Sequence, residues 1–220
     1  MAQRPPLAER LRIPGPAGDL EALIETPQAE AAAPGEVPAV AVVCHPHPLY
    51  GGTMDNKVVY TVARAFQQRG APAVRFNYRG VGASAGSYDE GRGETEDTLA
   101  VIDYARRRWP AAALWLGGFS FGGAVAVRAA GPAHPARVVL VAPAVGRIDL
   151  SAAAPPGCPW LIVQGDADEL VPRDEVLGWA RALTPVPAIT VLPGTGHFFH
   201  GRINELREAV LAFMAQAAPP

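Results

Sequence analysis

Apolar residues occur along the chain in short runs that alternate with stretches of helical spacing. Residues 39–44 (AVAVVC) form a continuous apolar run, which is typical of a strand buried on both faces. Residues 56–69 follow with apolar side chains at helical spacing, and Gly70 marks the end of this predicted helix. Further strands are predicted at 72–78, 112–116, 137–142, 160–164 and 188–192. Further helices are predicted at 94–108, 121–130, 173–183 and 203–216.

The first part of the chain has a different pattern. Residues 7–13 and 20–26 predict a short antiparallel pair, and the segment PGPAG at 14–18 supplies the turn between them. Residues 29–38 are rich in Ala, Pro and Glu, and we expect a surface loop there rather than a domain boundary. Apolar strands that alternate with helices predict an α/β fold, in which helices cover both faces of a mostly parallel sheet. We expect a single domain over residues 1–220.

Charge and composition exclude several classes of function. The 220 residues include 19 basic and 21 acidic side chains, and a net charge of −2 offers no basic face for nucleic acid. The apolar runs are too short to span a bilayer, and residues 1–15 mix charges with prolines, unlike a signal peptide. The two cysteines, Cys44 and Cys158, do not form a disulfide framework. We expect a cytoplasmic protein with neither nucleic acid nor membrane as a partner, and its oligomeric state stays open.

One loop carries a candidate nucleophile. Loops after the strands are where a parallel sheet holds its sites, and the loop after 112–116 contains G-x-S-x-G at Gly118, Ser120 and Gly122. A serine at such a sharp strand-to-helix turn takes a strained conformation, and its neighbours two positions away must be small. The turn also places Ser120 at a helix N-terminus, which favours a developing negative charge. The alternative is that Ser120 is an ordinary helix N-cap.

A serine hydroxyl also needs a base, and that base needs an acid to orient it. Of the five histidines, only His197 follows the last predicted strand, in a glycine-rich loop. The loop after 160–164 offers Asp166, Asp168 and Glu169. We prefer Asp168 because it lies in the middle of the loop, whereas Asp166 is placed at the strand end, where a turn residue is expected.

The order Ser120, Asp168, His197 resembles that of the α/β-hydrolase superfamily, and the resemblance covers essentially the whole chain. Residues 77–84 (NYRGVGAS) resemble the superfamily's loop after the fourth strand. Residues 44–57 (CHPHPLYGGTMDNK) look like those of a group of small bacterial serine hydrolases. The resemblance implies an eight-stranded sheet and a triad of these three residues, which needs no cofactor. It implies no particular substrate.

Acyl transfer passes through a tetrahedral oxyanion that needs amide donors. In α/β-hydrolases one donor is the amide after the nucleophile, here Phe121, and the other lies in the loop after the third strand. Because Pro46 and Pro48 have no N–H, the second donor is His47 or a later residue, and the resemblance favours the backbone amide of His47. On this interpretation the imidazole of His47 need not take part. His45 and His47 could instead be metal ligands, but no third ligand at a plausible spacing accompanies them, and we predict no metal site.

The gap at 143–159 is short and rich in Ala, Pro and Gly, which leaves no room for the helical lid of many α/β-hydrolases. We therefore predict a lidless site with an exposed catalytic serine and no deep tunnel for a long acyl chain. The candidates for substrate contact lie in loops beyond strand ends: Leu49, Tyr50, Tyr88, Val145 and Phe198.

The leading hypothesis is a serine hydrolase that cleaves small acyl esters, as a carboxylesterase, through an acyl-enzyme on Ser120. A thioesterase or a peptidase/amidase would use the same residues with a different leaving group. A non-catalytic binding module on the same fold is an alternative of another class, because fold does not determine function. Such a module is expected to lack at least one of the three catalytic candidates, and all three are present.

Overall fold

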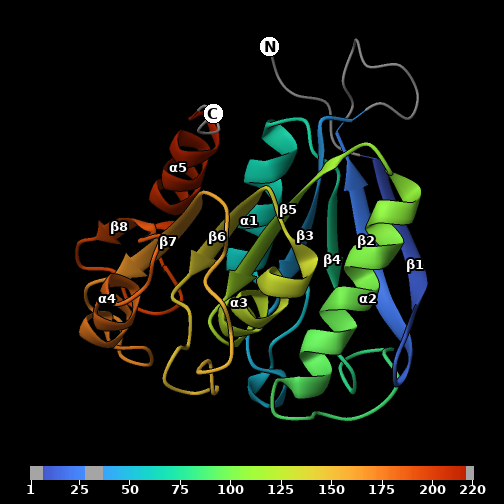
Figure 1. The fold of residues 1–220 in the computed structure, drawn as a ribbon, viewed down its shortest axis with the longest axis horizontal. Coiled ribbons are helices and arrows are strands. Elements are labelled where there is room, and N and C mark those ends of the chain that lie inside the picture. Colours follow the sequence, from blue (N-terminus) through green and yellow to red (C-terminus); the bar gives the residue numbers. More distant parts are fainter. Residues whose placement is uncertain (1–6, 28–36, 217–220) are drawn as a thin grey trace.

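The structure, a computed structural model, describes residues 7–27 and 37–216. Eight strands form one sheet in the order β1-β2-β4-β3-β5-β6-β7-β8 (Figure 1). The strands are β1 (Leu7–Gly15), β2 (Gly18–Thr26), β3 (Ala39–Cys44), β4 (Ala73–Phe76), β5 (Ala113–Phe119), β6 (Arg137–Val141), β7 (Trp160–Gly165) and β8 (Ala188–Leu192). The helices are α1 (Lys57–Gln68), α2 (Arg92–Arg108), α3 (Phe121–Ala133), α4 (Arg173–Arg181) and α5 (Ile203–Met214), with a short 3-10 turn, η1 (Pro48–Tyr50).

The sheet has the predicted mixture of parallel and antiparallel pairs. β1 pairs antiparallel with β2, and β2 pairs antiparallel with β4, whereas β4, β3, β5, β6, β7 and β8 run parallel to one another. The prediction of an α/β fold with an N-terminal antiparallel pair is confirmed. Of the surface loop predicted at 29–38, residues 29–36 lie outside the described residues.

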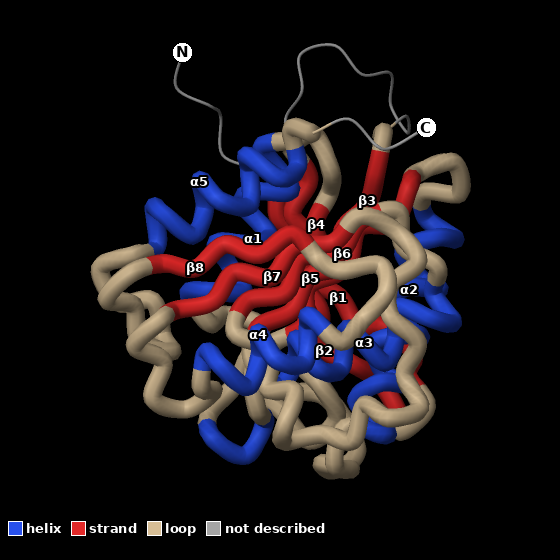
Figure 2. The backbone as a smooth tube through the Cα atoms, turned by 60° about the vertical axis from the view of Figure 1, so that its left-hand side comes forward, coloured by secondary structure: helices blue, strands red, loops and turns tan. Residues whose placement is uncertain are grey.

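Helices cover both faces of the sheet, and the alternation of side chains along β3 shows how. Val40 and Val42 belong to a buried cluster with residues of α2, α3 and α4. Ala41 and Val43 belong to the cluster on the opposite face, with residues of α1 and α5. Figure 2 shows α1 and α5 on one side of the sheet and α2, α3 and α4 on the other. The continuous apolar run of β3 is therefore required, because both of its faces are buried.

The predicted element boundaries are accurate to a few residues, and the largest difference bears on the site. β5 continues to Phe119, beyond the end predicted at residue 116, because Gly117 and Gly118 pair with Val43 and Cys44 of β3. Glycine is uncommon in strands, so the local pattern ended the strand too early. As a result, β5 runs directly into the turn that holds Ser120.

The connection between β6 and β7 decides whether the site has a lid. Residues 142–159 form turns and bends and contain no helix, so the predicted absence of a helical lid is confirmed. Among the described residues, no helix has both the length and the apolar character needed to cross a membrane.

Candidate active site

Ser120 occupies a strained turn between β5 and α3. Its φ of 55° and ψ of −118° lie in a region that residues other than glycine rarely adopt. Hydrogen bonds on both sides hold this conformation: the Ser120 N–H donates to the carbonyl oxygen of Val141 at 2.9 Å, and the Ala144 N–H donates to the Ser120 carbonyl oxygen at 3.0 Å. The end of β6 and the residues after it therefore fix the turn.

The two glycines of the G-x-S-x-G pattern cannot carry a side chain, and the reason differs between the two positions. A Cβ on Gly118 would overlap with the backbone of Gly122 across the turn, as the sequence predicted. A Cβ on Gly122 would instead overlap with backbone oxygens at the end of β3, and would lie only 2.5 Å from that of Cys44. At Gly122 the close neighbour is therefore another strand, which no local pattern reveals.

Ser120, His197 and Asp168 form one chain of hydrogen bonds. His197 Nε2 lies 3.0 Å from Ser120 Oγ, and His197 Nδ1 lies 2.9 Å from Asp168 Oδ2. Because a carboxylate only accepts, Nδ1 carries the proton, and Nε2 is left free to accept from the serine hydroxyl. Ser120 stands at the N-cap of α3, but its hydroxyl makes no capping hydrogen bond. The N-cap alternative therefore does not explain the side chain.

The Asp168 carboxylate is buried and surrounded by donors. Its Oδ1 accepts from the N–H of Leu170 at 3.0 Å and of Val171 at 2.7 Å, and Gln164 Nε2 donates to its Oδ2 at 3.1 Å. Burial by itself would raise the pKa of Asp168, but the hydrogen bonds from His197, Val171 and Leu170 outweigh it, and the pKa lies below its ordinary value. Asp168 is therefore an anion at neutral pH.

The two neighbouring acids have other partners. Asp166 Oδ1 accepts from the Gly194 N–H at 2.6 Å, which is the turn-stabilising role expected for it. Glu169 Oε2 accepts from the backbone N–H of His197 at 3.2 Å. Glu169 thus holds the loop of His197 through its backbone, a role that no pattern in the sequence indicates.

The loop after β3 is attached to the end of β4 by side chains. His45 is fully buried, with Nδ1 2.6 Å from the carbonyl oxygen of Pro46 and Nε2 accepting from the Tyr78 N–H at 3.1 Å. Asn77 Oδ1 accepts from the Met54 N–H at 2.9 Å. Desolvation lowers the pKa of His45 to about 3, so its ring is neutral.

Both nitrogens of His45 are thus occupied by backbone groups, which leaves neither for a metal ion. Among the described residues, no group of three or more His, Cys, Asp or Glu side chains is arranged to hold one.

The two candidate oxyanion donors are His47, in the loop after β3, and Phe121, the residue after Ser120, and their side chains are in contact. The rings of His47 and Phe121 have their centroids 4.8 Å apart. Neither the Phe121 N–H nor the His47 N–H has a hydrogen-bond acceptor within residues 7–27 and 37–216. Neither amide is therefore used in the hydrogen bonding of the described residues.

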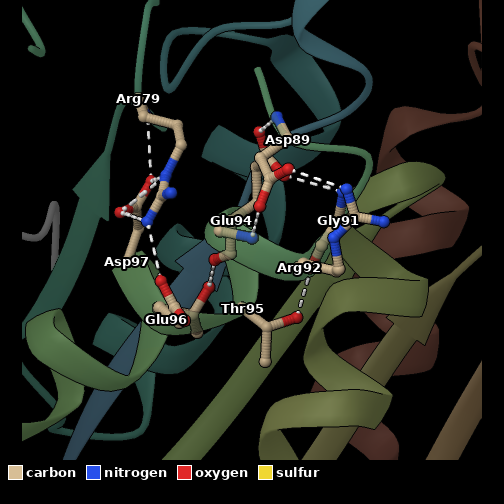
Figure 3. Close-up of polar contacts among 10 residues, drawn as sticks. Arg79, Asp89, Gly91, Arg92, Glu94, Thr95, Glu96 and Asp97 are labelled. Carbon is tan, nitrogen blue, oxygen red and sulfur yellow. Dashed lines mark hydrogen bonds and ion pairs between the residues drawn. The ribbon is translucent and has the colours of Figure 1, made fainter. Parts of the chain in front are cut away.

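The segment that follows β4 is held firmly by α2. Arg79 Nη2 lies 2.8 Å from Asp97 Oδ1, and Glu94 accepts from the backbone N–H of Asp89 at 2.9 Å and of Gly91 at 2.7 Å (Figure 3). Tyr88 lies next to this anchored stretch.

The candidates for substrate contact differ in exposure. Three are exposed, namely Leu49 (67%), Tyr50 (86%) and Phe198 (46%). Tyr88 and Val145 are half-buried; Tyr88 Oη lies 3.2 Å from His47 Nε2, and Val145 lines a groove of about 600 Å³ between residues 145–153 and α4.

The expectation of an exposed catalytic serine was wrong. Ser120 is only 9% exposed although no helical lid covers it. Ser120 is buried within the turn. Its backbone N–H donates to the end of β6, and its hydroxyl is hydrogen-bonded to His197. A lid is therefore not needed to keep this serine largely out of water.

Comparison with known proteins identifies the family of this chain. Residues 37–157 match the model of the family described as serine aminopeptidase, S33. An uncharacterized protein of Rickettsia prowazekii, RP471, is 34% identical over 200 residues, covering 86% of this chain and 83% of its own. XC6422 from Xanthomonas campestris, an α/β serine hydrolase without a lid, is 40% identical, with a TM-score of 0.91 over 100% of this chain and 99% of its own.

An α/β serine hydrolase homologue from Coxiella burnetii is 42% identical, with a TM-score of 0.88 over 94% of this chain and 97% of its own. The family match covers more than half of the sequence, and the similarity to the lidless enzyme extends over all of it. The chain therefore belongs to the α/β-hydrolase superfamily, among its serine hydrolases.

Proposed function

We propose that this chain hydrolyses small acyl esters through an acyl-enzyme intermediate on Ser120. The observation that carries the proposal is the unbroken chain of hydrogen bonds from Ser120 through His197 to Asp168, at a strained turn on a helix N-terminus. A binding module would have no need to keep a serine, a correctly protonated imidazole and an ionised acid in contact. Membership of a hydrolase family supports the same conclusion.

The mechanism follows from the protonation states. His197 Nε2 takes the proton of Ser120 Oγ while Oγ attacks the ester carbonyl carbon, so a C–O bond forms and the carbonyl oxygen becomes an anion. The imidazolium of His197 then gives this proton to the leaving alkoxide as the original ester C–O bond breaks. A water molecule attacks the acyl-enzyme in the same way, and the acid and free Ser120 result. Asp168 stabilises the imidazolium in both halves and keeps its own charge.

Oxyanion stabilisation is assigned to two backbone amides. The N–H groups of Phe121 and His47 lack acceptors among the described residues, and Phe121 is the first residue of α3, where the helix dipole favours a negative charge. An oxyanion hole of this kind contributes about 2.7–4 kcal/mol for each donor.

The same groups would cleave a thioester or an amide, and the family description names an aminopeptidase. We favour an ester because esters are more reactive toward a serine nucleophile than amides. Short acyl chains are expected, since the segment at 142–159 that replaces a lid is built of turns.

The proposal is tested with a fluorophosphonate probe, which forms a covalent bond to an activated serine. We expect stoichiometric labelling of the wild-type chain, the same labelling of Ser87→Ala, and none of Ser120→Ala. Ser87 is a suitable control because it is exposed and lies in a different loop. If intact wild-type protein takes up no label, or if Ser120→Ala is labelled, the hydrolase mechanism on Ser120 is wrong.

Substrate class is tested with a set of p-nitrophenyl esters whose acyl chains vary from two to twelve carbons, together with a thioester and an anilide of the preferred acyl group. We expect kcat/KM to be highest for the short esters. A preference for chains longer than about eight carbons would contradict the expectation of short acyl chains, since a long chain needs a deep buried pocket. A preference for the anilide would instead support the aminopeptidase or amidase alternative.

A further inference from the structure

The side chain of His47 is bonded through both of its ring nitrogens. Nδ1 accepts from the backbone N–H of Leu49 at 3.2 Å, so the ring caps the short turn η1. Nε2 lies 3.2 Å from Tyr88 Oη. The first contact is made within the loop after β3, and the second reaches the segment after β4.

These partners determine where the ring carries its proton. The Leu49 N–H can only donate, so Nδ1 must be without a proton in order to accept from it. A neutral imidazole then has its proton on Nε2, which donates to the oxygen of Tyr88. Desolvation lowers the pKa of His47, which favours this neutral form. Protonation of Nδ1 would bring two donors face to face and break the contact with Leu49.

The ring is also packed between aromatic side chains. Its centroid lies 4.7 Å from that of Tyr50, 5.0 Å from that of Tyr88 and 4.8 Å from that of Phe121. Phe121 is the residue whose amide is the other proposed oxyanion donor. The imidazole thus belongs to one of the two proposed donor residues and contacts the other.

Tyr88 is placed by a rigid support. The adjacent backbone at Asp89 and Gly91 donates to the buried carboxylate of Glu94 at the start of α2 (Figure 3). The loop of His47 is held independently at its far end by Asn77. The hydrogen bond between His47 and Tyr88 thus links the loop of His47 to the segment whose backbone is anchored on α2.

We infer that the imidazole of His47 is a positioning group: held by Leu49 and Tyr88, it fixes the direction of the His47 peptide N–H toward the developing oxyanion. This inference deepens the proposed function and rests on it. The backbone at His47, with φ of −54° and ψ of 123°, is also held from both sides: the Pro46 carbonyl oxygen of the same peptide unit lies 2.6 Å from His45 Nδ1, and the His47 carbonyl oxygen accepts from the Gly52 N–H at 3.1 Å. The ring adds a side-chain restraint to these backbone contacts. On this inference the ring has a role in addition to that of the backbone amide.

The kinetic test uses variants that keep the peptide N–H. We expect Tyr88→Phe, which loses only the hydroxyl, to lower kcat about 3–10-fold, and His47→Ala to lower it about 10–100-fold. These losses are smaller than the ~10²–10³-fold loss of a whole oxyanion donor, because the amide is misdirected rather than removed. KM should change little, because the hydrogen bond from the His47 N–H to the substrate's carbonyl oxygen strengthens only when that oxygen becomes an anion.

Two further variants separate positioning from general damage. His47→Asn should recover part of the activity lost in His47→Ala, because its side-chain oxygen can accept from the Leu49 N–H as in an Asx turn. His134→Asn is the control: this exposed histidine ends α3 with φ of 45°, a conformation that asparagine tolerates, and kcat should be unchanged. If Tyr88→Phe and His47→Ala both keep wild-type kcat, the inference is wrong.

A measurement that needs no turnover separates this inference from the proposed function. In a ¹⁵N-labelled sample at neutral pH, long-range ¹H–¹⁵N correlations should show His47 as a single neutral tautomer, protonated on Nε2, and the Nε2 resonance should shift in Tyr88→Phe. A proton on Nδ1, or a mixture of tautomers, would overturn the inference even in an active enzyme. If the ring is as expected but no ester is cleaved and Ser120 takes up no probe, the proposed function fails and the positioning role fails with it.

Discussion

Replacement of Asp168 by asparagine tests the proposed mechanism most directly. The carboxylate receives donors on both oxygens: the amides of Leu170 and Val171 on Oδ1, Gln164 Nε2 on Oδ2, and His197 Nδ1 within reach of both. Asparagine has one oxygen and one NH₂ group. If the oxygen stays on the two backbone amides, the NH₂ group faces His197 Nδ1.

That arrangement moves the proton of the neutral His197 ring from Nδ1 to Nε2. The NH₂ group can only donate, so His197 accepts on Nδ1 and carries its proton on Nε2, where it can no longer take the proton of Ser120. The corresponding loss in serine proteases is about 10⁴-fold in kcat, or about 5.5 kcal/mol at 1.36 kcal/mol per tenfold. We expect a loss of this order here, because the distances from His197 to Asp168 and Ser120 are those of a direct contact.

The assay is steady-state hydrolysis of a short p-nitrophenyl ester, with circular dichroism to verify that the variants are folded. Asp166→Asn is the matched control: it retains an oxygen to accept from the Gly194 N–H, and its kcat should stay within about threefold of wild type. If Asp168→Asn loses less than about tenfold, or if Asp166→Asn is the more damaging, then Asp168 does not orient the base.

Three further outcomes follow from other parts of the structure. Gly122→Ala should destabilise the fold by about 3 kcal/mol or more, because its Cβ would meet the backbone of β3; Gly131→Ala in the same helix has open space and should raise stability by up to about 1 kcal/mol, both measured by urea unfolding. His45 has a folded pKa of about 3, below its ordinary 6.5, so only the unfolded chain binds its proton between these values, and stability falls as the pH falls. The free energy of unfolding should therefore be about 2 kcal/mol lower at pH 5 than at pH 7 through His45, and the difference between the two pH values should be smaller in His45→Gln. Phe198→Ala should raise KM for aryl esters more than for ethyl esters if this exposed ring contacts the leaving group beside His197, and equal changes would contradict that contact.

Features that depend on neighbours along the chain could be predicted from the sequence. A strand buried on both faces is apolar at every position, so the strand at residues 39–44 could be predicted from its continuous apolar run. The G-x-S-x-G turn is equally local, since the strain at Ser120 and the close approach of Gly118 to Gly122 arise within five residues. The chain order of Ser120, Asp168 and His197 then followed from which loop comes after which strand.

Contacts between segments that are far apart in the chain became apparent only in the folded structure. Gly122 is small because β3 passes beside it, and Glu169 holds the backbone of His197 from another loop. The burial of Ser120 in a lidless protein and the bond between His47 and Tyr88 likewise depend on residues far apart in the chain. The physical reason is the same in each case: these contacts form across strands that the sheet brings together, and hydrophobic patterning specifies which segments are strands but not which atoms meet at their ends.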